Sequence, residues 1–148
     1  MKFTAIAISC LAGIAAALPQ GSIEKDAEWT VSGLTVAAQP GEPGALGTHY
    51  SFTVKTSTQS ALCDAHSQQG GAPLGVIPKT ACNPDAFAFS WTPKGEGATL
   101  EIFDSTTKQH AVHQISGDEI RTLPFIVLGS HPHVYSGPTE VIVETLLD

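Results

Sequence analysis

The sequence predicts an all-β protein: an antiparallel β-sandwich or β-barrel of seven to eight short strands. Two observations support this fold class. Short runs rich in β-branched and aromatic residues recur along the chain, and turn clusters separate them every eight to twelve residues. Fourteen glycines and ten prolines among 148 residues favour turns and strands over long helices. A chain of this length can bury one core, so a single domain is expected.

The first 17 residues have the pattern of a secretory signal peptide. One lysine precedes an almost wholly apolar run over residues 4–14, and three small residues, Ala15 to Ala17, follow it. An apolar run of about 11 residues is too short for a membrane-spanning helix, which needs about 20. We therefore expect cleavage after Ala17, a secreted extracellular protein and no membrane span.

Residues 18–27 are polar and contain Gly and Pro, which predicts a flexible lead-in before a single β domain at 28–148. Residues 39–47 are expected to be a loop, because two prolines and three glycines cannot hold a regular ladder. A short helical turn is possible only at 116–123. Strands are expected at 28–36, 49–55, 61–66, 86–92, 99–103, 110–115, 122–128 and 139–146.

Alternation assigns faces to the clearest strands. In the first strand, Gly33 is a candidate for a β-bulge. The run 49–55 places Tyr50, Phe52 and Val54 on one face and polar residues on the other. The run 94–97 (KGEG) is a tight connection, so the strands on either side of it should form a hairpin.

Four aromatic residues admit two interpretations. Phe87, Phe89 and Trp91 share one face of their strand, and Trp29 lies in the first strand. These side chains could line a ligand cavity if the sheet closes into a barrel. Core packing is the favoured interpretation, because small β-barrels are usually filled by such side chains.

The cysteines predict one disulfide. Loss of the signal peptide removes Cys10 and leaves Cys63 and Cys82. In an oxidising compartment such a pair most often forms a bridge, which here closes a loop of about twenty residues and contributes about 3 kcal/mol. The bridge is expected to hold 61–63 and 82–85 side by side.

The net charge of the chain indicates which class of partner is not expected. Seven basic residues against fourteen acidic ones give a net charge of −7. No basic patch is available to neutralise phosphates, so nucleic acid is not expected as a partner.

Six histidines are unusual in a chain with so few charged residues. His110 and His113 form HAVH, whose members point to opposite faces of a strand, whereas His131 and His133 form HPH and could share a face. Such imidazoles could bind copper or zinc. Solvent-exposed loop histidines are the favoured interpretation, so neither a metal nor another cofactor is expected.

No catalytic motif stands out. The serine in the sequence Gly129-Ser130-His131 lacks the second glycine of a G-x-S-x-G elbow. Asp64 and His66 lie two apart beside Cys63 and could hydrogen-bond on one face, but no activated nucleophile accompanies them. Paired carboxylates for hydrolysis would have to come from Glu96, Glu101, Asp104, Glu140 or Glu144. We therefore do not expect an enzyme.

Several features together resemble a known family. They are the signal peptide, the strand that begins near Trp29, the HYSFTV strand, and the run from Cys63 to Cys82 that continues through Asn83-Pro84 to Phe87-Ala88-Phe89. This pattern resembles the Alternaria-major-allergen-like family of small secreted fungal proteins, over about residues 28–145. The resemblance implies a compact β-barrel or sandwich of the effector, elicitor or allergen type. It implies no catalytic residues.

The favoured hypothesis is a secreted fungal β-protein without catalytic activity that binds an extracellular host protein, a cell-wall component or a small ligand. Two alternatives stay open. One is a secreted protein that binds copper or zinc through histidines, and the other is a small secreted hydrolase.

Overall fold

The computed structural model describes residues 28–40, 46–68, 74–124, 126 and 131–147. The expected signal peptide and lead-in lie outside these residues, as do 41–45 of the expected loop. The described chain forms ten β-strands and one short 3₁₀ helix. They are β1 (Glu28–Pro40), β2 (Leu46–Lys55), β3 (Ser60–Ser67), β4 (Ile77–Ala81), β5 (Phe87–Lys94), β6 (Gly97–Asp104), β7 (Gln109–Ile115), η1 (Gly117–Glu119), β8 (Ile120–Thr122), β9 (His133–Tyr135) and β10 (Glu140–Leu147).

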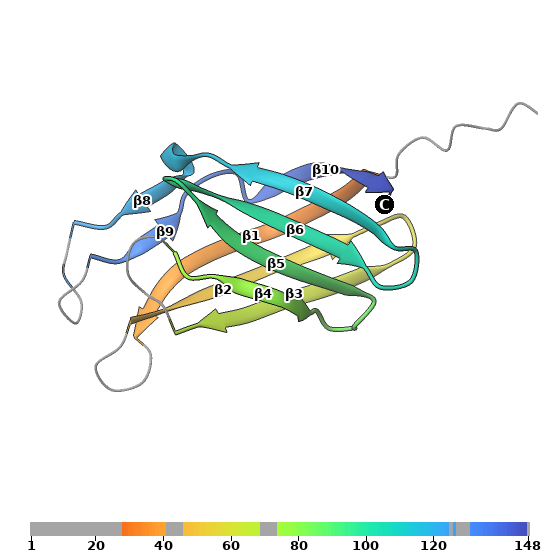
Figure 1. Ribbon diagram of the computed structural model, residues 1–148, viewed down its shortest axis with the longest axis horizontal. Coiled ribbons are helices and arrows are strands. Elements are labelled where there is room, and N and C mark those ends of the chain that lie inside the picture. Colours follow the sequence, from red (N-terminus) through yellow and green to blue (C-terminus); the bar gives the residue numbers. More distant parts are fainter. Residues whose placement is uncertain (1–27, 41–45, 69–73, 125, 127–130, 148) are drawn as a thin grey trace, which may run out of the picture.

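The strands form one antiparallel sheet that nearly closes into a barrel (Figure 1). Its order is β3-β2-β1-β10-β7-β6-β5-β4, and β9 joins β1 and carries β8 as a short extension. The all-β antiparallel prediction is therefore confirmed, and of its two forms the structure is closer to the barrel.

The strands at the two ends of the sheet order, β3 and β4, meet at one seam. The backbones of Leu62 and Asn83 exchange two hydrogen bonds there, with N···O distances of 2.9 and 2.7 Å. Beside them a disulfide joins Cys63 to Cys82, whose Cα atoms are 4.3 Å apart. The predicted bridge is confirmed, and so is the side-by-side placement of the segments that it connects.

The barrel interior is filled by large side chains. Tyr50, Phe52 and Val54 all point inward from β2, as their alternation predicts. Phe52 of β2 meets Phe89 of β5 edge to face, with ring centroids 5.0 Å apart. Aromatic contacts of this kind connect opposite walls of the barrel and add specific geometry to apolar burial.

Gly33 is the predicted bulge. Its φ of +67° lies in the left-handed region that favours glycine, and the register between β1 and β2 shifts between Ser32 and Thr35. The β1 strand then continues to Pro40, beyond the expected end at residue 36. The loop expected at 39–47 is therefore wrong at both ends, because Gln39 pairs with Gly47 and Pro40 with Leu46.

Two predictions in the second half of the chain need correction. A strand expected at 122–128 instead begins at Ile120 and ends at Thr122, since its pairing with β9 sets its position; 125, 127 and 128 of the expected range lie outside the described residues. The helical turn expected at 116–123 shortens to η1 for the same reason. The strands β4 and β9 were not expected from the sequence.

Candidate functional site

A cleft of about 480 Å³ is lined by residues of η1, β8 and β9 and of the β5–β6 turn. This volume is within the range of small-molecule sites. The strands β8 and β9 lie at one end of the barrel, on the left in Figure 1. Segments from four parts of the chain form the walls of the cleft: β5 with the following turn, η1, the β8–β9 pair, and Leu74, three residues before β4. The lining residues are Leu74, Trp91, Pro93, Gly95, Glu96, Gly97, Gly117, Ile120, Thr122 and His133.

Trp91 connects the cleft to the barrel core. It points inward from β5 and is fully buried, and its ring lies 5.2 Å from that of Tyr50. Its indole N–H is buried and has no hydrogen-bond partner among the described residues. Most buried donors in proteins are paired, and an unpaired one costs about 1–3 kcal/mol. The nitrogen itself has almost no accessible surface, so an acceptor atom of a ligand reaches it only when the Trp91 ring or a neighbouring side chain moves.

Hydrogen bonds fix the rim of the cleft. The backbone N–H of Ser136, just after β9, donates to the carbonyl oxygen of Glu119 at 2.7 Å. The Glu119 carboxylate accepts from the backbone N–H of Ser116 at 2.8 Å, which caps η1. On the opposite side, the Tyr50 hydroxyl donates to the carbonyl oxygen of Gly75, next to Leu74. These hydrogen bonds connect η1 to the segment after β9, and β2 to the segment before β4.

The two tyrosines that support this end of the barrel have perturbed acidities. Burial raises the pKa of Tyr50 well above its usual value. Burial also raises the pKa of Tyr135 to about 12, and the nearby carboxylate of Glu119 adds to the effect. Both hydroxyls therefore stay protonated and donate hydrogen bonds, that of Tyr135 to the carbonyl oxygen of Pro138 at 2.9 Å.

The four aromatic residues that the sequence singles out have two different positions in the structure. Trp29, Phe87 and Phe89 are core residues, and the rings of Trp29 and Phe87 meet edge to face at 5.4 Å. None of these three lines the cleft, whereas Trp91 does. The sequence therefore named one residue that belongs to both the core and the cleft.

The histidine pairs singled out from the sequence are differently placed. His110 and His113 lie on β7 rather than in a loop, opposite Phe103 and Leu100 of β6 respectively. Both are half-buried, so the interpretation as exposed loop residues is wrong for this pair. His131 is exposed, and His133 is half-buried in β9 at the wall of the cleft.

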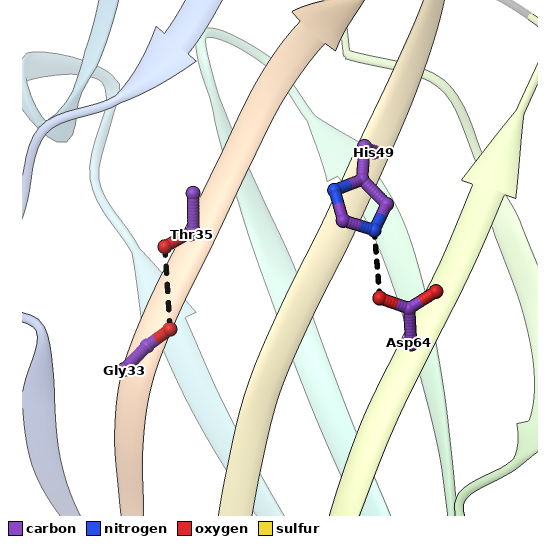
Figure 2. A network of polar contacts seen from close by, with 4 residues as sticks. All are labelled: Gly33, Thr35, His49 and Asp64. Atoms are coloured by element: carbon purple, nitrogen blue, oxygen red, sulfur yellow. Dashed lines mark hydrogen bonds and ion pairs between the residues drawn. The ribbon is translucent and has the colours of Figure 1, made fainter.

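Another histidine cluster lies on the outer face of the barrel. His49 of β2 stands directly opposite His66 of β3, and their rings stack with centroids 4.4 Å apart. The Nε2 atom of His49 lies 2.7 Å from the Oδ2 atom of Asp64, toward which it points in Figure 2. Within the described chain, these three residues form the one group of three or more His, Cys, Asp or Glu side chains close enough to hold a metal ion.

This outer-face cluster was only partly visible in the sequence. The sequence predicts that Asp64 and His66 could share a face, but it does not connect them with His49, which is 15 residues away from Asp64. The signal that could have found it is the β2–β3 register. A hairpin that pairs Lys55 with Ser60 also pairs His49 with His66.

Comparison with protein-family models, with curated proteins and with solved structures gives no match to this chain. The described residues include no helix long and apolar enough to cross a membrane. The function is therefore argued from the geometry of the cleft and of the outer-face cluster.

Proposed function

We propose that this protein is a secreted, non-catalytic binding protein that takes a small ligand into the cleft at the end of its barrel. The observation that carries the proposal is Trp91, which lines that cleft and whose buried indole N–H has no partner among the described residues. Ligand sites combine apolar walls with a few placed polar groups that fix orientation. The cleft has this composition.

The lining residues restrict the chemistry of the ligand. Leu74, Pro93 and Ile120 offer apolar contact, and the Trp91 N–H calls for an acceptor such as a carbonyl oxygen. Glu96 also lines the cleft, and none of the described lining residues is a lysine or arginine. A neutral or cationic ligand with a flat apolar body and one acceptor suits these walls better than an anion.

Observations other than the cleft support the proposal that the protein is extracellular. The first 17 residues have the signal-peptide pattern, and the Cys63–Cys82 bridge is of a kind that persists in oxidising compartments. The resemblance to the Alternaria-major-allergen-like family agrees with a small secreted fungal barrel of the effector or elicitor type. An extracellular host protein or a cell-wall component remains a partner class that the same protein could bind.

Calorimetric titration with small aromatic probes tests the cleft. Benzamide offers a carbonyl acceptor without charge, and benzoate offers the same ring with a negative charge. We expect the wild-type protein to bind benzamide more tightly than benzoate. The variant Trp91→Phe keeps an apolar ring but loses the donor, so its affinity for benzamide should fall by about tenfold.

Trp29→Phe is the matched control, because Trp29 is an equally buried tryptophan that does not line the cleft. It should bind benzamide as the wild type does. Equal affinities of the wild type and Trp91→Phe, or loss of binding in Trp29→Phe alone while it still melts cooperatively, would contradict the assignment. So would a preference for benzoate.

The secretion part of the proposal has its own test. N-terminal sequencing of protein recovered from the medium of a fungal expression host should begin at or near Leu18. Recovery of a chain that begins at Met1 would contradict it.

A further inference from the structure

We propose that His49, Asp64 and His66 form a binding site for a divalent transition-metal ion, zinc or copper(II), on the outer face of the β2–β3 hairpin. This inference departs from the expectation that the protein has no cofactor. It is independent of the end cleft, because none of the three residues lines that cleft.

The backbone sets the three side chains on one face. His49 and His66 are directly opposed in the antiparallel register, and Asp64 is two residues before His66. Their strand neighbours Tyr50 and Cys63 are buried, so the alternation of the strands turns the cluster toward solvent. Cys63 is also bonded to Cys82, which anchors β3 next to Asp64. The ligands thus come from paired strands rather than from a loop.

The donor atoms are already close. The nitrogen and oxygen atoms that could bind an ion all lie within 4.8 Å of one another, and two of them are 2.7 Å apart. A tetrahedral zinc ion with bonds of about 2.0–2.1 Å separates its ligand atoms by about 3.3 Å. The largest adjustment is therefore about 1.5 Å, which side-chain rotation can supply because His66 and Asp64 are exposed.

The donor set selects the class of metal. Two imidazoles and one carboxylate suit zinc, copper(II) or nickel, whereas calcium and magnesium prefer all-oxygen sites. Three protein ligands leave a fourth position open to water or to an external ligand. The partial exposure of the site, with 23% of the His49 side chain and 48% of the Asp64 side chain accessible, leaves room for that ligand.

A hydrogen-bonded surface pair is the simpler alternative. His49 and Asp64 already contact one another as an exposed pair, and such pairs contribute little to stability. That alternative accounts for the 2.7 Å contact but gives no role to His66, whose ring is stacked on His49. The metal site involves all three side chains.

The test is calorimetric titration of the secreted chain, prepared without a histidine tag and freed of metal with EDTA, using zinc chloride and copper(II) chloride. We expect one ion bound per chain. His66→Ala and Asp64→Asn should each lower the affinity at least tenfold, and each should melt at the temperature of the metal-free wild type because both positions are exposed. Excess zinc should raise the melting temperature of the wild type and leave that of His66→Ala in place.

A variant with four other histidines replaced, His110→Ala, His113→Ala, His131→Ala and His133→Ala, is the matched control and should keep the wild-type affinity. The electron paramagnetic resonance spectrum of the copper(II) form should show nitrogen ligands in the wild type and lose them in His49→Ala. Absence of wild-type binding at millimolar metal, unchanged affinity in both His66→Ala and Asp64→Asn, or loss of binding in a fourfold variant that still melts cooperatively would overturn the proposal.

Discussion

Removal of the Cys63–Cys82 bridge should lower the free energy of unfolding by about the amount that loop-closure entropy gives for a loop of this length. The bridge lies where the terminal strands β3 and β4 meet, and only one backbone pair, Leu62 with Asn83, accompanies it in the described seam. The 19-residue separation gives a denatured-state entropy term of about 11 cal/mol/K, or about 3 kcal/mol at 25 °C. For a domain of this size the melting temperature should fall by about 10 °C.

The assay is urea unfolding of the wild type and of the double variant Cys63→Ala/Cys82→Ala, followed by circular dichroism. The wild type treated with a phosphine reductant is the control, because it keeps both side chains and loses only the bond. We expect both samples to lose about 3 kcal/mol of unfolding free energy with little change in native-state spectra. A loss below about 1 kcal/mol in both would refute the view that this bond secures the seam.

Three further outcomes follow from the structure. The Asp104 carboxylate is partly desolvated, but hydrogen bonds from Thr106 and Thr107 hold its pKa below the usual value of 3.8. The stability that it supplies at neutral pH is therefore lost as the pH falls through the folded-state pKa, so Asp104→Asn should cost about 1–2 kcal/mol in urea at pH 7, and this cost should shrink progressively as the pH is lowered below 3.8. Tyr50 and Tyr135 are the two tyrosines of the chain and both have raised pKa values, so absorbance at 295 nm should show no ionisation near pH 10 until the protein unfolds. Gly97→Ala should lower the melting temperature more than Gly95→Ala, because a Cβ atom at Gly97 would lie 2.1 Å from a backbone oxygen of β7, whereas a Cβ atom at Gly95 meets no atom within 4 Å and costs only the strain of its φ of +61°.

The parts of the fold that the sequence predicts are those in which alternation is regular. The β2 strand alternates between buried and accessible positions over nearly its whole length, and the inward positions of Tyr50 and Phe52 follow from that pattern. The β4 strand was missed because only Ile77 of its five residues is buried and the next residue is Pro78. Its strand form depends on pairing with β5, which local composition does not reveal.

The cleft was not predictable for a related reason. Its walls come from Leu74, from the β5–β6 turn and from the β8–β9 pair, which are far apart in sequence and are brought together by the closing of the sheet. The aromatic pattern identified Trp91 as an inward residue, but it could not separate this tryptophan from Trp29. That distinction depends on the position of Trp91 near the end of the barrel.

The most direct test of the central claim is a proton–nitrogen correlation spectrum of the two indole N–H groups, recorded while benzamide is added. The chain contains two tryptophans, so the wild type gives two indole signals, and Trp29→Phe assigns them. The account predicts that the Trp91 signal moves with saturation and that the Trp29 signal stays in place. A Trp91 signal that remains unmoved at saturating benzamide would contradict the account.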